Sequence, residues 1–181
     1  MDAAQGCLAA ACALVFAAPA FGQESKSSAP AKELASALEA AKLDSIAALD
    51  PSQPDVYIAA LHLPGVQLLT VAGKYPVPAL LKDKLAKKEY REIYLDLNGA
   101  SIPASKVFVE DLGADGLRAK RGDSQAFDSY EAGGTRTVFD GNPGKQKLSE
   151  QEYLKVFSTA DEMYSRMLTA LLTQLRTAAK N

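Results

Sequence analysis

The sequence contains no tryptophan, a single histidine and only two cysteines among its 181 residues. One histidine cannot build the multi-histidine sites of zinc or non-haem iron enzymes. His62 lies in an apolar run, with no serine or cysteine at a recognisable catalytic spacing, and is interpreted as a structural residue. The nucleotide-binding signatures GxxxxGK[ST] and GxGxxG are also missing. The sequence therefore assigns no catalytic residue and no metal ligand.

An excess of charge of either sign is lacking as well. The 20 Lys and Arg side chains nearly balance the 22 Asp and Glu side chains, for a formal net charge of −2. This balance gives no electrostatic reason to expect a nucleic-acid partner. Apolar residues make up 48% of the chain and charged residues 23%, which is the composition of a folded globular protein and excludes wholesale disorder.

Residues 1–23 have the pattern of a secretory signal peptide. An uncharged apolar run extends to Ala20, and small residues stand two apart at Ala18 and Ala20, as at a cleavage site. The run is shorter than the roughly 20 residues that a spanning helix needs. Cleavage would remove Cys7 and Cys12 and leave a cysteine-free chain without a membrane span. The sequence therefore predicts a periplasmic or secreted protein without disulfides.

Residues 24–30 are polar and contain serine and proline, which predicts a flexible linker, and residues 31–181 are expected to form a single domain. Helical spacing of leucines predicts a helix from Ala31. The stretch 45–50 fits either the end of this helix or a first strand, and both alternatives stay open. Apolar runs separated by turn residues predict strands at 56–63, 66–72, 92–98, 106–112 and 117–120, and a hairpin that turns on Gly133–Gly134. The first two runs are nearly continuously apolar, so both faces of these strands are expected to be covered.

Two more helices are predicted, one starting near Pro78 and one at the end of the chain. Ser149 and Glu152 have the spacing of a capping box, and apolar residues then recur at helical spacing to about residue 178. We expect this apolar stripe to pack as core against the sheet. The order of elements predicts an α+β fold with a mostly antiparallel sheet flanked by helices, including a long C-terminal helix.

Charged side chains gather in the second half of the predicted sheet. The carboxylates are interpreted as solvated turn residues, because aspartate is common in turns for local hydrogen bonding. They are Glu110, Asp111, Asp115, Asp123 and Asp128. A basic cluster could either bind a phosphate or carboxylate or form a solvated strand edge, and both interpretations stay open. It consists of Arg118, Lys120 and Arg121, with Lys106 and Arg136 nearby across the hairpins.

Lys74 follows a predicted buried strand and precedes a predicted helix start, where backbone N–H groups favour an anion. The run SIAALDPSQPDVYIAALHLPGVQLLTVAGKYPVPALL, starting at Ser45, resembles the start of the FMN-binding split-barrel superfamily, the pyridoxamine-phosphate-oxidase-like proteins. The resemblance covers about residues 43–120. It implies a split β-barrel in which Lys74, at the family's basic position, contacts the flavin phosphate, with Arg118 or Arg136 as further cofactor contacts.

These observations support three hypotheses of function. The first is an exported, non-catalytic α+β module without a cofactor that binds a small molecule or a protein. Its binding surface would lie between sheet and helices and include Lys74, Tyr75, Tyr94, Arg118 and Tyr130. The second, implied by the resemblance, is an FMN-binding oxidoreductase, so whether the chain is an enzyme stays open. The third is a homodimeric scaffold paired through the C-terminal helix.

Overall fold

A computed structural model describes residues 25–49, 52, 56–63, 67–73, 107–120 and 127–179. Six described strands form one sheet in the order β1-β2-β3-β4-β5-β6, and each strand pairs antiparallel with the next. The strands are β1 (Ser45–Leu49), β2 (Tyr57–Leu63), β3 (Gln67–Gly73), β4 (Val107–Asp111), β5 (Ser129–Ala132) and β6 (Thr135–Val138). The helices are α1 (Ser28–Ala41), the short 3-10 turn η1 (Pro143–Gln146) and α4 (Glu150–Ala179). The predicted α+β class is confirmed.

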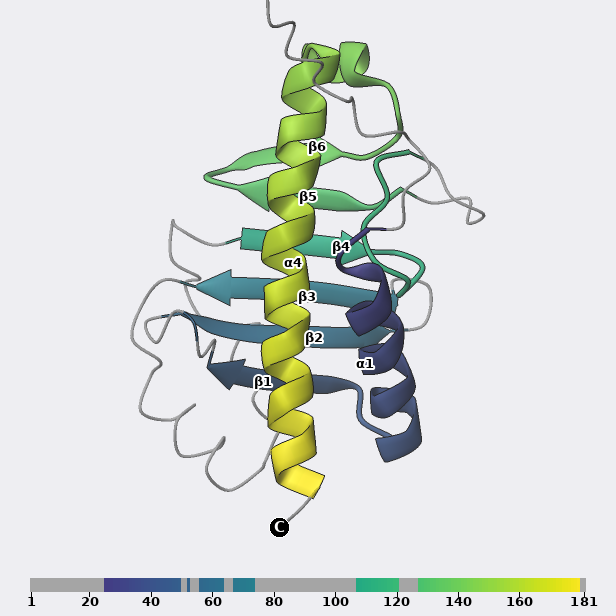
Figure 1. Ribbon diagram of the computed structural model, residues 1–181, viewed down its shortest axis with the longest axis vertical. Coiled ribbons are helices and arrows are strands. Elements are labelled where there is room, and N and C mark those ends of the chain that lie inside the picture. The colour runs from purple at the N-terminus through teal and green to yellow at the C-terminus, as the bar shows by residue number, and fades with distance from the viewer. Residues whose placement is uncertain are drawn as a thin grey trace, which may run out of the picture.

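Both long helices lie on the same face of the sheet. Figure 1 shows α4 crossing all six strands, with α1 beside it. The side chains beneath them come from one face of successive strands, since directly paired residues share a face. Ile46, Ala60, Thr70 and Val109 form one such row, and each is almost completely buried.

The apolar stripe of α4 packs against this face, as predicted. Its buried members include Tyr153, Ala160, Tyr164, Leu168 and Leu171, which belong to the same core as the strand residues. At about 25 cal/mol per Å² of buried apolar surface, a fully buried leucine contributes about 2 kcal/mol, so this stripe fixes α4 on the sheet.

The predicted capping box begins α4. The Ser149 hydroxyl accepts the Glu152 backbone N–H at 3.2 Å, and the Glu152 carboxylate accepts the Ser149 backbone N–H at 2.8 Å. These reciprocal bonds satisfy two N–H groups that a helix start would otherwise leave unpaired. The first helix begins at Ser28, three residues before the predicted start at Ala31.

The structure resolves one open alternative and corrects one prediction. Residues Ser45–Leu49 form a strand, β1, and not the end of α1. The strand predicted at 117–120 is wrong, because this segment is not paired in the sheet. The backbone N–H groups of Leu117 and Arg118 are bound by side chains instead, as described below. The helix predicted near Pro78 and the strand predicted at 92–98 lie outside the described residues.

The second face of the sheet differs from one end to the other. Over β2 and the first part of β1 it is buried, as Ala47, Tyr57, Ala59 and Leu61 show, so both faces of β2 are covered as predicted, whereas Leu49 at the end of β1 is 42% exposed. Over β4 to β6 it is partly exposed. The row of described strands ends at β1 on one side and β6 on the other (Figure 1). Closure into a barrel stays a prediction.

Candidate functional site

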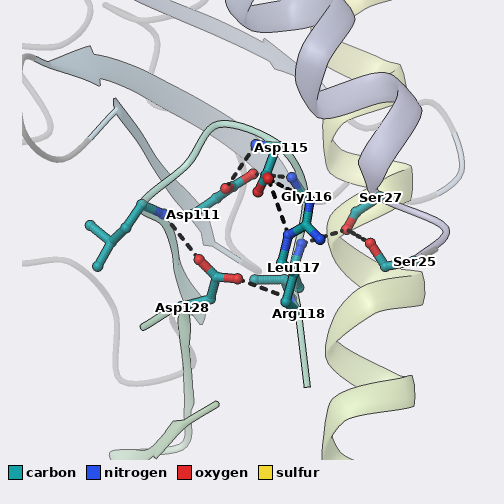
Figure 2. A network of polar contacts seen from close by, with 9 residues as sticks. Ser25, Ser27, Asp111, Asp115, Gly116, Leu117, Arg118 and Asp128 are labelled. Atoms are coloured by element: carbon teal, nitrogen blue, oxygen red, sulfur yellow. Dashed lines mark hydrogen bonds and ion pairs between the residues drawn. The ribbon is translucent and has the colours of Figure 1, made fainter. Parts of the chain in front are cut away.

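Two carboxylates organise the loop that follows β4, and Figure 2 shows them at close range. Asp111, the last residue of β4, accepts the backbone N–H of Asp115 at 3.1 Å and that of Gly116 at 2.8 Å. Its second oxygen also accepts the hydroxyl of Tyr164 from α4 at 3.3 Å. The Asp111 side chain is therefore bonded on both oxygens and joins β4, the loop and α4.

Asp128, just before β5, holds the two ends of the same loop. One carboxylate oxygen accepts the Leu112 N–H at 3.1 Å, and the other accepts the Arg118 N–H at 2.9 Å. With Asp111 this carboxylate takes four of the loop's backbone donors. The bond to Arg118 takes a backbone donor of the predicted strand at 117–120 away from the sheet, which helps to explain why that strand does not form.

The loop is fastened to the start of α1 by Ser27. The Ser27 hydroxyl accepts the Leu117 N–H at 2.9 Å and donates to Asp161 of α4 at 2.6 Å. Asp161 also accepts the backbone N–H groups of Lys26 and Ser27, at 2.8 and 3.0 Å. Gly116 lies so close to α1 that an added Cβ would stand 2.5 Å from the Ser28 backbone. We call this arrangement of Asp111, Asp128 and Ser27 around residues 112–118 the loop clamp.

Burial shifts the protonation of the loop clamp. Asp111 is fully buried and Asp128 is 8% exposed. Desolvation raises the pKa of Asp111, although its backbone N–H bonds oppose the shift. Desolvation, reinforced by the negative charge of Asp111, raises the pKa of Asp128 to about 7. Burial also raises the pKa of the Tyr164 hydroxyl, and the neighbouring Asp111 adds to that shift.

Shifted carboxylates often mark catalytic sites, but this pair binds the backbone of the chain itself. All four carboxylate oxygens already accept hydrogen bonds from the chain itself. A general acid or base must reach a substrate proton within about 3 Å, and both of these side chains are buried. The interpretation of Asp111 and Asp128 as solvated turn residues is also wrong, because they are buried and bind backbone donors from within the fold.

The exposed charges of the sheet lie on the face turned away from the helices. Glu110 of β4 accepts the hydroxyl of Ser129 at 2.6 Å and forms an ion pair with Arg136 of β6. The Arg136 Nε also donates to the Ser129 hydroxyl at 3.3 Å. In the adjacent row, Phe108, Glu131 and Arg136 are paired across β4, β5 and β6. These five residues form what we call the sheet patch.

The residues predicted to form a binding site are not all placed together. Arg118 lies in the loop clamp and forms an ion pair with Asp115 at 2.5 Å, whereas Arg136 lies in the sheet patch. Tyr130 lies on the helix-covered face and points its hydroxyl at the Met163 sulfur, 3.8 Å away. Tyr130 and Arg136 therefore lie on opposite faces of the sheet. Lys74, Tyr75 and Tyr94 lie outside the described residues.

Sequence reasoning missed several residues that the fold brings together. Phe108 and Glu131 join Arg136 in the sheet patch because of strand register, and the Gly133–Gly134 turn would have given that register for β5 and β6. Ser27 and Asp161 meet across 134 positions of sequence, and no local signal connects them. His62 is half-buried in β2, and its backbone N–H donates to Asp44.

Comparisons with protein-family models, curated proteins and solved structures found no match. Within the described residues, no group of three or more His, Cys, Asp or Glu side chains is arranged to hold a metal ion. The helices of that part of the chain include none that is both long and apolar enough to cross a membrane.

Proposed function

We propose that this chain is an exported, non-catalytic module that binds a protein partner through the sheet patch. The observation that carries the proposal is the contrast between two groups of charges. The shifted carboxylates of the loop clamp are buried and fully bonded by the chain itself, whereas the charges of the sheet patch face outward on rigid strands. The proposed export rests on the signal-like pattern of residues 1–23.

The composition of the sheet patch suits a protein surface. It combines an aromatic side chain, Phe108, with the guanidinium of Arg136, and both residue types are enriched at protein interfaces. The Arg136 side chain is 54% exposed, even though it is paired with Glu110. This partly exposed strand face offers room for a folded partner.

The charge of the sheet patch indicates what the partner should present. Arg136 balances Glu110, and the second carboxylate, Glu131, makes no ion pair with any described residue. The patch therefore carries one excess negative charge beside an aromatic ring. We propose a partner with a lysine or arginine directed at Glu131 and an apolar side chain directed at Phe108.

Photo-crosslinking in the native compartment tests this function. A photoreactive phenylalanine analogue in place of Phe108 should yield an adduct, and the same analogue in place of Arg166, on the outer face of α4, should not. Adding Glu131→Lys should lower the adduct yield about tenfold, because it turns an attraction into a repulsion. The matched change Glu39→Lys, at an exposed position of α1, should leave the yield unchanged.

Three outcomes contradict the proposal: no adduct at Phe108, equal adducts at both positions, or equal effects of the two charge reversals. The absorbance of the purified chain gives a separate check. A band near 450 nm would overturn the non-catalytic assignment in favour of a bound flavin, which performs redox chemistry without catalytic side chains.

A further inference from the structure

The outer edge of β6 presents backbone groups in an alternating pattern. Phe139 donates its N–H to the Asp128 carbonyl at 2.9 Å, and Ala132 pairs with Thr135 across a two-residue turn. In an antiparallel pair, alternate residues direct their N–H and C=O groups toward the partner strand. Thr135 and Thr137 therefore face β5, and the backbone groups of Arg136 and Val138 point away from the sheet.

A glutamine side chain occupies half of this edge. The Gln146 Oε1 atom accepts the Val138 N–H at 2.8 Å, and its Nε2 atom donates to the Val138 carbonyl at 2.6 Å. A side-chain amide has the same donor and acceptor as a peptide group. Gln146, at the end of η1, thus makes the two bonds that a residue of a seventh strand would make with Val138.

We propose that the outer edge of β6 is a strand-addition surface for β6 of a second copy of this chain, and that the Gln146 amide keeps it closed. β6 is the last described strand of the sheet (Figure 1). Arg136 is exposed beside the closed position, and neither its N–H nor its C=O has a hydrogen-bond partner among the described residues. An unpaired edge of this kind is a template for another strand.

The alternation of outward-pointing backbone groups along β6 favours β6 of a second copy as the strand that pairs with this edge. Two antiparallel β6 strands related by a twofold axis at Thr137 would pair Arg136 with Val138 of the other copy, twice. This register forms four backbone hydrogen bonds and sets each guanidinium beside a neutral side chain. A register centred on Arg136 would place like charges opposite each other, which is destabilising. The favoured pairing is self-complementary and closed, as in most homodimers.

Opening the edge should convert a monomer into a dimer. We expect light scattering of the full chain to give a doubled mass for Gln146→Ala and for Gln146→Met, which keeps the length of the side chain. Wild type and the matched control Gln151→Ala, at an exposed position of α4, should remain monomeric at the same concentration. Far-UV circular dichroism identifies which variants are folded. Two Gln146 variants are used so that the test can still be made if one of them does not fold.

A second substitution distinguishes edge pairing from general association. Arg136→Pro removes an N–H that points away from β5, so the hairpin keeps its own hydrogen bonds. In the Gln146→Ala background it should return the mass to that of a monomer. The inference is overturned if folded Gln146 variants stay monomeric, if wild type is already dimeric, or if Arg136→Pro leaves the dimer intact. Each readout is the mass of the purified chain and needs no partner, although Arg136 also belongs to the sheet patch.

Discussion

The loop clamp should make this protein less stable as the pH rises through neutrality. Most aspartates do the opposite, because their native-state pKa is lowered by the bonds they make. Asp128 has a pKa of about 7 in the folded chain, against the ordinary value of 3.8, because burial and Asp111 disfavour its charge. The native state therefore binds a proton that the unfolded state releases between these values.

The sign and the size of this change in stability follow from the linkage between proton binding and folding. Since the native state holds more protons, the free energy of unfolding falls as the pH rises from 3.8 to about 7 and levels off above that. At about 1.4 kcal/mol for each pH unit, the loss attributable to Asp128 is about 4 kcal/mol. The raised pKa of Asp111 acts in the same direction.

Urea denaturation followed by circular dichroism at pH 5, 6, 7 and 8 measures this dependence. Asp128→Asn removes the ionisable group, so its free energy of unfolding should vary much less with pH, although the amide can accept only one of the two N–H bonds that the carboxylate accepts. Asp44→Asn, at an exposed position, should keep the wild-type slope. The reasoning is refuted if wild-type stability is flat or rises between pH 5 and 8, or if Asp128→Asn keeps the wild-type slope.

Three further substitutions, one of them with a matched control, test the packing around the loop clamp and α4 by urea denaturation. Gly116→Ala should lower the free energy of unfolding by several kcal/mol, because φ is +89° and the added Cβ would stand 2.5 Å from backbone atoms. The control Gly133→Ala, with open space around the added Cβ, should lower it by about 1 kcal/mol. Equal costs would contradict the close approach of the loop to α1. Tyr153→Phe should lower the free energy of unfolding by about 1–3 kcal/mol, because the hydroxyl donates to the Ala119 carbonyl and accepts the Gly141 N–H. A loss below about 0.5 kcal/mol would show that these bonds do not stabilise the fold. Ser149→Ala should cost about 1 kcal/mol through loss of the helix cap, and unchanged stability would argue against the capping box.

Features encoded by neighbouring residues were predictable from the sequence. The hairpin on Gly133–Gly134 and the capping box at Ser149 each depend on residues within a few positions of one another. The strand at 117–120 was predicted wrongly because its competitor is not local. The carboxylate of Asp128 reaches back ten positions to the Arg118 N–H and removes it from the sheet.

The candidate site was harder to predict from the sequence, because the face of the sheet on which a side chain lies decides which residues it can contact. Tyr130 and Arg136 both looked available for a ligand, yet Tyr130 is paired with Thr137, the neighbour of Arg136. Adjacent residues of a strand point to opposite faces, so the two side chains are separated by the sheet. The partners of Gln146 were beyond prediction, since they depend on how η1 folds back along β6.

The bonds between Asp161 and the N–H groups of Lys26 and Ser27 have a consequence for the order of folding. They connect the first described residues to the last helix, and Leu34 and Leu38 of α1 are buried in the same core as α4. The anchor of α1, Asp161, lies in α4, 135 and 134 positions along the chain from the Lys26 and Ser27 N–H groups that it binds. Contacts so distant in sequence are slow to form. The apolar face of the sheet therefore stays uncovered until α4 packs on it, and in that interval the chain is most exposed to aggregation or to capture by a chaperone.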